Sequence, residues 1–518
     1  MKTIKNLYKT RYVGILLLTI LLAFSCEDLL EETPFDVTDS SFLSTESGLE
    51  AGVNGLYNLM RELYYPAGTD APIQASGFFR IATDLGVARI ASSWAYDPNS
   101  YSPTSIGPTG KWDQLYLIIE RCNTVISSAA NVDMDQNKKD VLLAQARAMR
   151  AETYMEAYTI YNNIVLKTEP AVDVEYVPAN PADIWALVNS DLDFAISKLS
   201  WGVEPGRYGQ GVARHLRGNA AMWQQDWQEA ANQYDAIVDN GTHHLVGVNE
   251  VFSGDRMHAE SLYTYPFSQE LASGNASAGG GATAFASMFV NRLYEAGSGE
   301  IIQAVEYGGQ SFGWAFPNDY CESLYDQTND NRYTTYYYDP STYIVNNPDH
   351  PNFGQPFVST EDNYRRYHFS LRKFHDENKP ATSTDSYQNY IHYRFAETLL
   401  FGAEAHWRLG GSTDSKALEY INMVRRRAFD NDPAFDYTSI TLDTYLEEHA
   451  REMALEHSRW FLLKRLGLLA ERVSLHFMVG SNSTNVSNRI MQPHMVNYPI
   501  PQSEIDLMGN PNFQNSGY

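Results

Sequence analysis

Apolar residues recur at three- and four-residue intervals over several long segments of the chain. In residues 111–131 the recurring positions are Trp112, Tyr116, Ile119, Asn123 and Ile126. This spacing keeps them on one face of a helix with 3.6 residues per turn, so it predicts an amphipathic helix. Residues 140–163 follow after a short polar break and contain no Gly or Pro. They predict a second helix, antiparallel to the first.

Two further segments, 219–241 and 396–429, alternate small and large apolar residues at the intervals of tetratricopeptide repeats. Small residues such as Ala220 let two helices approach closely, while aromatic residues such as Trp223 fill the space beside them. Residues 445–467 predict one more helix, whose last residue is a C-capping glycine. The predicted fold class is therefore mainly α, with helical hairpins stacked like tetratricopeptide repeats into a curved scaffold.

Between residues 241 and 386 the helical period disappears. Gly, Asn, Asp, Tyr and Pro are abundant, as in SGNASAGGGATAF and NDNRYTTYYYDPSTY, and the short apolar runs predict small strands and long loops. Long loops on a rigid frame are where binding usually occurs. We therefore expect one domain over residues 26–518, with an N-terminal helical part (26–240), a loop-rich region on the ligand side (241–386) and a C-terminal helical part (387–518).

The first 25 residues have the pattern of an export signal. Four basic residues and no acidic one precede an apolar run, residues 13–23, which is about half of the ~20 residues that a transmembrane helix needs. Ala23 and Ser25 are the small residues that a signal peptidase requires, and the segment resembles a bacterial lipoprotein signal ending at Cys26. We predict that residues 1–25 are removed and that Cys26 carries acyl chains, which anchor the protein to a membrane.

The formal net charge of −25 narrows the classes of ligand. Nucleic acid is not expected, because phosphate contacts made by Lys and Arg supply most of the affinity of nucleic-acid-binding proteins. Anionic glycans are somewhat less expected as well, although a local basic patch could override the overall charge.

Thiols and metal ligands are few. Besides Cys26 the chain has Cys122 and Cys321, and no CxxC motif or Cys/His cluster that would indicate zinc. Two packed thiols are expected, with one bridge between them as the alternative. Segments 326–331 and 430–433 carry hard oxygen ligands at short spacing. A structural calcium ion there is an alternative to the turns that the same residues favour; no other cofactor is predicted.

Catalytic motifs are weak in this sequence. Two charge pairs have partners three residues apart on predicted helices, Arg394 with Glu397 and Glu456 with Arg459. They predict ion pairs on the helical frame, either exposed or buried, rather than catalytic pairs. A pair of glycosidase carboxylates cannot be located by spacing, because the separation that matters is spatial.

Aromatic residues in the irregular region are the strongest indication of a ligand. The chain has 35 Tyr, 23 Phe and 9 Trp, and residues 312–338 hold a dense share of them, including Phe312, Trp314, Phe316, Tyr320 and Tyr325. A sugar ring has an apolar C–H face, on which an aromatic ring stacks, and a polar rim that Arg, Asn and Asp can hydrogen-bond. Burial beneath a loop is the alternative for each ring, although the consecutive tyrosines 336–338 cannot all face one core.

Several segments together resemble the SusD/RagB family of Bacteroidetes outer-membrane lipoproteins. The similar segments, in order, are the stretch that begins CEDLLEETPF, WDQLYLIIERCNTVI, NDYCESLYDQTNDNR, YRFAETLLFGAEAHWRLG with ALEYINMVRRRA, EHSRWFLLKRLG and the ending QNSGY. Their order and spacing carry the resemblance. Two departures, Ala450 where Glu is frequent and Leu462 where Asp is common, lie in the predicted helical scaffold.

The resemblance implies a lipoprotein on the outer face of the outer membrane that captures nutrient oligomers, usually glycans, and does no chemistry. The implied partner is a SusC-like TonB-dependent transporter, over which the protein sits. Acidic residues directly after Cys26 are similar to surface-export signals in that phylum. Trp94 and Trp314 lie in loops that resemble those where family members carry stacking tryptophans; the further candidate ligand residues are Tyr96, Arg80, Tyr294 and Asn99. Peptide capture, as in the RagB branch, and a lipoprotein glycoside hydrolase remain the alternatives.

Overall fold

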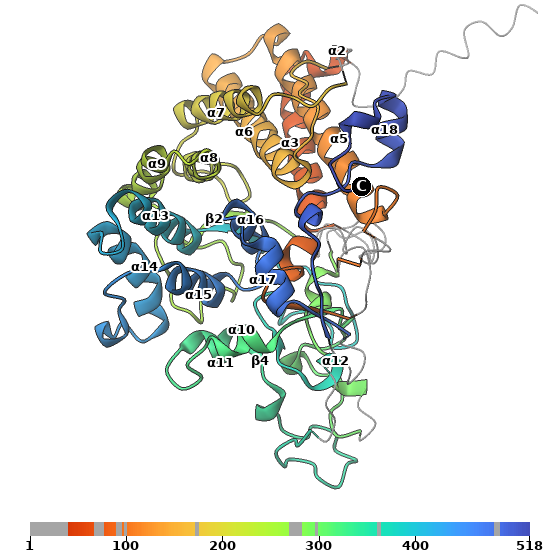
Figure 1. Ribbon diagram of the computed structural model, residues 1–518, viewed down its shortest axis with the longest axis vertical. Helices are drawn as coiled ribbons and strands as arrows, with labels where there is room; N and C mark the ends of the chain where they lie inside the picture. Colours follow the sequence, from red (N-terminus) through yellow and green to blue (C-terminus); the bar gives the residue numbers. More distant parts are fainter. Residues whose placement is uncertain are drawn as a thin grey trace, which may run out of the picture.

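The computed structural model describes residues 40–66, 77–89, 96–97, 101–170, 176–268, 282–295, 299–359, 364–480 and 487–518. The predicted lipid-bearing residue Cys26 and two candidate ligand residues, Trp94 and Asn99, lie outside these ranges, as do the predicted export signal and most of the glycine-rich stretch. Helices form a curved array along one side of the molecule, and short strands and loops occupy the other end (Figure 1). The fold is mainly α, as predicted.

The array contains α3 (Glu46–Tyr64), α5 (Ile106–Ser128), α6 (Gln136–Tyr161), α7 (Pro181–Lys198), α8 (Gln210–Gln224), α9 (Trp227–Asn240), α13 (Phe395–Gly410), α14 (Ser415–Ala428), α15 (Leu442–Met453), α16 (Ser458–Arg465) and α17 (Leu469–His476). The short helices are α2 (Ser40–Leu43), α10 (Asp319–Ser323), α11 (Asn331–Tyr336), α12 (Tyr364–Tyr367) and α18 (Gln502–Met508). The strands are β1 (Gly86–Ala88), β2 (Ser261–Tyr265), β3 (Ala315–Pro317), β4 (Tyr337–Tyr338), β5 (Ser370–Leu371), β6 (Tyr390–Arg394), β7 (Met478–Val479) and β8 (Ser487–Asn488).

The predicted helical hairpins are present. Helices α5 and α6 pack on each other, as do α8 with α9 and α13 with α14. At the start of α6 the Asp135 side chain accepts a hydrogen bond from the backbone N–H of Lys138, and the C-cap residue after its last turn, Asn162, has φ 63°. The segment 219–241 holds the end of α8 and all of α9, separated by a turn in which Gln225 has φ 59°.

Close approach of α8 and α9 depends on a glycine. A Cβ atom on Gly218 would lie 2.6 Å from ring atoms of Tyr234, which is fully buried. Gly218→Ala should therefore lower the free energy of unfolding by about 1–3 kcal/mol through overpacking. Gly55→Ala is the matched control, since a Cβ there meets no atom within 4 Å, and it should stabilise helix α3 by roughly 0.5–1 kcal/mol. Urea denaturation of both variants tests this, and equal effects would contradict it.

The helix predicted over residues 445–467 is interrupted, which corrects that expectation. α15 ends at Met453 and α16 begins at Ser458, with Leu455 between them at φ 57°. The break leaves backbone carbonyls without helical partners, and the buried side chains of Lys373 and Arg394 bind them. The Lys373 ammonium donates to the carbonyl oxygens of Glu452 (2.7 Å) and Ala454 (3.2 Å). These contacts stabilise an interruption that the apolar pattern does not show.

A buried ion-pair network surrounds this break. The Arg394 guanidinium contacts the carboxylates of Glu260 (3.0 Å), Glu452 (2.6 Å) and Glu456 (2.8 Å). Its inner members are Glu260, Arg332, Lys373, Arg394, Arg427, Glu448, Glu452 and Glu456, and Asp330, Arg425 and Arg451 pair with them. The ion pairs predicted between residues three positions apart are not the observed ones. Arg394 precedes α13, and the side chain of Glu397 lies 3.2 Å from His215. Arg459 pairs with Asp84 at 2.7 Å.

Short strands join distant segments at the loop-rich end. A four-stranded sheet has the order β3-β1-β7-β8, with β1 antiparallel to β3 and parallel to β7. β2 pairs with β6, and β4 pairs with β5. One apolar core extends from Leu49 to Phe513, through the N-terminal, loop-rich and C-terminal parts. Cys122 and Cys321 are buried in it as free thiols, as predicted.

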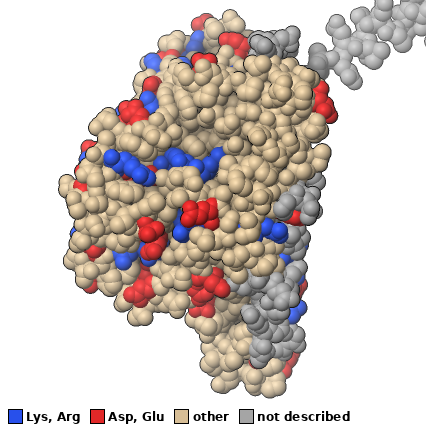
Figure 2. Space-filling view, viewed as in Figure 1, with Lys and Arg blue, Asp and Glu red and all other residues tan. Residues whose placement is uncertain are grey.

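Charge is unevenly distributed over the surface despite the acidic excess. Figure 2 shows several Lys and Arg side chains near the middle of one face, with Asp and Glu side chains around them. Within the ranges that the structure describes, no helix is both long and apolar enough to span a bilayer.

Candidate functional site

Three arginines and three aromatic residues meet at the loop-rich end of the molecule. We call them the arginine–aromatic cluster; its members are Arg89, Arg292, Tyr294, Phe312, Trp314 and Arg365. Arg89 follows β1, Trp314 precedes β3, Tyr294 lies in a 3-10 turn and Arg365 belongs to α12. Pairing of β1 with β3 brings residues more than two hundred positions apart together. The cluster lies near α12, away from the stacked helices α7 to α9 (Figure 1).

An aromatic stack forms the apolar part of the cluster. The rings of Phe312 and Trp314 lie 4.6 Å apart at an interplanar angle of 19°. Backbone hydrogen bonds fix both residues, from Phe312 N–H to Ser287 O (2.7 Å) and from Trp314 N–H to Met288 O (2.9 Å). Trp314 is 9% exposed, whereas Phe312 is half-buried. Trp314 therefore packs beneath the ring of Phe312, and the Phe312 ring exposes the larger fraction of its surface to solvent.

The arginines form the polar part. Arg89 donates its backbone N–H to Trp314 O (2.8 Å), and its guanidinium lies 6.0 Å from the Trp314 ring centroid. Arg292 Nε donates to the hydroxyl of Tyr294 at 3.1 Å, and its guanidinium pairs with Glu295. Arg365 lies 3.7 Å from the same carboxylate. Within the described residues, Arg292 and Arg365 share the carboxylate of Glu295 and Arg89 forms no ion pair, so the cluster has a local excess of positive charge.

The pKa values of two arginines in the cluster are lowered, first by burial and in part by the neighbouring positive charge. Burial, followed by repulsion from Arg292, lowers the pKa of Arg89. Burial and then Arg292 likewise lower the pKa of Arg365, against an opposing contribution from Glu295. Both groups stay cationic at neutral pH, because an arginine pKa starts near 12.5.

The structure places the predicted ligand residues in different surroundings. Trp314 and Tyr294 belong to the arginine–aromatic cluster, and the Tyr294 hydroxyl lies 3.3 Å from Ser311 O. Trp94 and Asn99 are outside the described residues. Tyr96 is fully buried, where its hydroxyl donates to Ala82 O at 2.7 Å. It belongs to the core rather than to a surface that a sugar could contact.

Arg80 is also in the core. It is 1% exposed, and its guanidinium lies between two rings, 4.8 Å from the centroid of Tyr65 and 4.7 Å from that of Phe285. Such cation–π contacts explain how a charged group is tolerated there. Arg80 and Tyr96 are therefore left out of the proposed site.

Most of the loop tyrosines are structural as well. Tyr336 and Tyr337 belong to the main core, whereas Tyr338 packs into a separate small cluster with Val290 and Phe357. The three consecutive tyrosines are all buried but do not share one core. The aromatic density of the region therefore mainly reflects packing under the loops.

The three arginines of the cluster were not singled out in the sequence. They stand at positions 89, 292 and 365, and nothing in their local sequence distinguishes them from other arginines. A partial signal was the pair Arg365–Arg366 in a polar stretch of an acidic chain.

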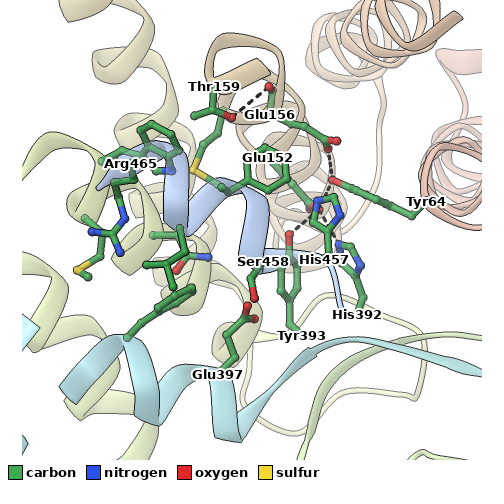
Figure 3. A pocket seen from close by; sticks show the side chains of 17 residues that line it. Tyr64, Glu152, Glu156, Thr159, His392, Tyr393, Glu397, His457, Ser458 and Arg465 are labelled. Atoms are coloured by element: carbon green, nitrogen blue, oxygen red, sulfur yellow. Dashed lines mark hydrogen bonds and ion pairs between the residues drawn. The ribbon is translucent and has the colours of Figure 1, made fainter. Parts of the chain in front are cut away.

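A second candidate site is a cavity between α6, α8, α13 and α16 (Figure 3). Its volume is about 80 Å³, room for a few water molecules. Polar and titratable side chains line it, among them Tyr64, Glu152, Glu156, His392, Tyr393, Glu397, His457 and Arg465. Burial lowers the pKa of His392 and of His457, so both imidazoles are neutral at pH 7.

The carboxylates beside this cavity are occupied by other protein groups. Glu152 accepts hydrogen bonds from the hydroxyls of Tyr64 (3.0 Å) and Tyr393 (2.8 Å) and from that of Tyr208. Glu156 forms an ion pair with Lys111 at 2.7 Å. Such an interlocked set fixes the positions of α3, α6 and β6, and it provides no free carboxyl group for acid–base catalysis.

The oxygen-rich segments form turns. Asp326 accepts hydrogen bonds from the backbone N–H groups of Thr328 and Asn329, and Asn331 donates to Asp430 at 2.7 Å, which joins the two segments. In the described part of the chain, no group of three or more His, Cys, Asp or Glu side chains is placed to hold a metal ion.

Comparisons with known proteins agree with this architecture. Residues 251–518 match the family model described as the SusD family. A SusD-like protein of Formosa agariphila is 24% identical over 554 residues, covering 96% of this chain and 97% of that protein. A SusD-like protein of Bacteroides ovatus is 22% identical, covering 86% and 80% of the two chains.

Solved structures are similar over nearly the whole chain. A laminarin-binding SusD-like protein superposes with a TM-score of 0.69 at 22% identity, covering 92% of this chain and all of that one. A surface glycan-binding protein A from Bacteroides thetaiotaomicron, in complex with laminarihexaose, has a TM-score of 0.71 at 20% identity and covers 91% of this chain and 99% of that one. At these identities the comparison establishes the fold.

Proposed function

This chain belongs to the SusD family, and on that premise we propose that it is a glycan-binding lipoprotein of the outer cell surface. It captures oligosaccharide or polysaccharide and passes it to a SusC-like TonB-dependent transporter in the outer membrane. Two similar structures support this proposal, a laminarin-binding SusD-like protein and a surface glycan-binding protein in complex with laminarihexaose. The export signal supports the proposed lipid on Cys26, and family membership supports the proposed transporter partner.

One observation supports the site most directly, the stack of Phe312 on Trp314 with guanidinium groups around it. A stacked, half-buried ring provides a rigid apolar surface for the C–H face of a sugar. The neighbouring guanidiniums supply several N–H donors for the hydroxyl rim, in the fixed geometry of a planar group. Trp94, which lies outside the described residues, stays a proposed second stacking residue.

Affinity gel electrophoresis tests this proposal. The panel contains laminarin, dextran, polygalacturonate and dextran sulfate, so that neutral and acidic polymers are both represented. At least one polymer should retard the protein, and Phe312→Ala with Trp314→Ala should weaken that binding by about tenfold or more, since such a ring contact is worth ~1–2 kcal/mol. Phe312→Leu keeps an apolar side chain without the ring and should weaken it in the same direction.

Trp185→Ala provides the control. Trp185 is half-buried and packs on Tyr158 in the helical array, so its loss should not change retardation. Tight binding of peptides with no response to any polysaccharide would support peptide capture instead. Release of reducing ends from a bound polymer would show a glycoside hydrolase and overturn the non-enzymatic proposal.

A further inference from the structure

We propose that the glycan carries anionic substituents, uronate carboxylates or sulfate esters, and that Arg89, Arg292 and Arg365 bind them beside the Phe312 ring. This inference rests on the proposed function and specifies its ligand. It opposes the expectation from net charge, which is −25 for the whole chain.

The first support is the imbalance of charge in the cluster. Among the described residues, the Arg89 side chain forms no ion pair, and Arg292 and Arg365 share the single carboxylate of Glu295. The side chains of Arg292 and Arg365 are only 24% and 22% exposed, so water compensates them incompletely. The Nε atoms of Arg89 and Arg365 are buried, and neither has a hydrogen-bond partner in the part of the chain that the structure describes. Unused donors on partly buried cations are suited to an anionic ligand.

The second support is the contrast with other buried arginines in the same molecule. Arg332 contacts three carboxylates, Arg394 three and Arg427 two. Burial opposes the charged form of each, but the carboxylates outweigh it and raise the pKa of all three. The pKa values of Arg89 and Arg365 move in the opposite direction. These three arginines of the frame are balanced by carboxylates, whereas the three arginines of the cluster have only Glu295 among the described residues.

The third support is geometry. The Arg89 guanidinium lies 6.0 Å from the Trp314 ring, and a Cβ atom built on Gly313 would lie 3.1 Å from side-chain carbons of both Arg292 and Arg365. The cations therefore border the residue between the two stacked rings. A sugar resting on Phe312 would bring a carboxylate or sulfate at its rim within reach of a planar guanidinium, which binds either group in a bidentate manner.

The experiment compares neutral and anionic polymers on the full-length mature protein at moderate ionic strength. Polygalacturonate supplies carboxylates, dextran sulfate supplies sulfate esters, and dextran and laminarin supply neither. We expect at least one anionic polymer to bind at least tenfold more tightly than the neutral ones. Its affinity should fall as salt increases, because salt screens charge contacts. Which anionic polymer binds distinguishes uronates from sulfate esters.

Two substitutions with opposite expected effects on the affinity for anionic polymer test the roles of the charged residues. Arg89→Gln should weaken binding of the anionic polymer about tenfold but binding of a neutral polymer by a few-fold at most, because Gln keeps an N–H donor for a hydroxyl group and loses only the charge. Arg89 forms no ion pair with the residues that the structure describes, so the substitution breaks none of those pairs. Glu295→Gln should strengthen it a few-fold, because it removes the competing carboxylate. Arg207→Gln is the matched control, since Arg207 is also half-buried over a ring, 4.7 Å from the centroid of Tyr57, and should have no effect.

The outcomes separate this inference from the proposed function. Binding of neutral polymers alone, still dependent on Phe312, would overturn the anionic ligand and keep the glycan-binding proposal. Anionic binding that is unchanged in Arg89→Gln and Arg292→Gln would overturn the assignment of the arginines. Retardation by none of the polymers would overturn both.

Discussion

Replacing Arg394 with Leu should lower the free energy of unfolding by about 3–5 kcal/mol. The guanidinium is 1% exposed, and its removal leaves the carboxylates of Glu260, Glu452 and Glu456 without their shared cation. Uncompensated charges in a buried site cost far more than the contact itself contributes. Urea denaturation followed by circular dichroism measures the change.

A surface ion pair provides the comparison. Arg426 pairs with Asp436, but its side chain is 47% exposed. Arg426→Leu should leave the urea midpoint unchanged within error, because water solvates the partner that remains. A change below 1 kcal/mol in Arg394→Leu would show that the buried network does not stabilise the fold. A variant that fails to fold would exceed the expected loss in the same direction.

The protein should lose stability as the pH falls from about 4.5 towards 2. Burial alone would raise the pKa of Glu448, but Arg332, Arg451 and Arg425 outweigh it and hold the value at about 2. The same balance lowers the pKa of Glu452 and Glu456. A pKa lower in the folded than in the unfolded chain stabilises the fold above the unfolded value. That contribution disappears as the pH drops through the folded value, and for Glu448 it amounts to about 3 kcal/mol.

Buried histidines should make the free energy of unfolding begin to fall at a higher pH than the carboxylates do. Burial lowers the pKa of His449 and His457 well below 6.5, so protons bind them more readily in the unfolded chain. Stability should therefore begin to fall below about pH 6.5 and fall more steeply below 4.5. Urea midpoints at pH 7, 5.5, 4 and 3 measure both steps. In Glu448→Gln, which cannot ionise, the lower step should shrink; a step of unchanged size would contradict its assignment to this network.

The helical hairpins could be predicted because their signals are local. The apolar positions of α5 and the absence of Gly or Pro in α6 depend on residues within a few turns of each other. The break between α15 and α16 could not be predicted in this way. The cations that bind its free carbonyls are Lys373 and Arg394, about 60 to 80 residues earlier in the chain. The apolar pattern continues across the break, so it predicts a continuous helix. It contains no information about partners so far away in the chain.

The candidate site was only partly accessible to sequence reasoning for the same reason. Trp314 and Tyr294 were candidates because aromatic residues in loops suit sugars, and Trp314 also because its loop resembles those where family members carry stacking tryptophans. Tyr96 has the same local character yet is fully buried, where it accepts a hydrogen bond from Trp460 Nε1 at 2.9 Å. Residue type and loop context cannot separate these cases. The arginines of the cluster meet only because β1 pairs with β3 and the backbone N–H of Arg292 bonds to Arg365 O at 2.7 Å.

The ion-pair network also restricts how relatives of this protein could be recombined. The loop-rich region contributes Glu260, Arg332 and Lys373 to it, and the C-terminal helical part contributes Arg394 and Glu452. A chimaera that exchanged the whole loop region for one with different charges would bury unmatched ions in the frame. A graft meant to transfer ligand preference through the proposed site would therefore exchange only the outer segments around residues 89, 292–314 and 365 and leave the inner charges in place.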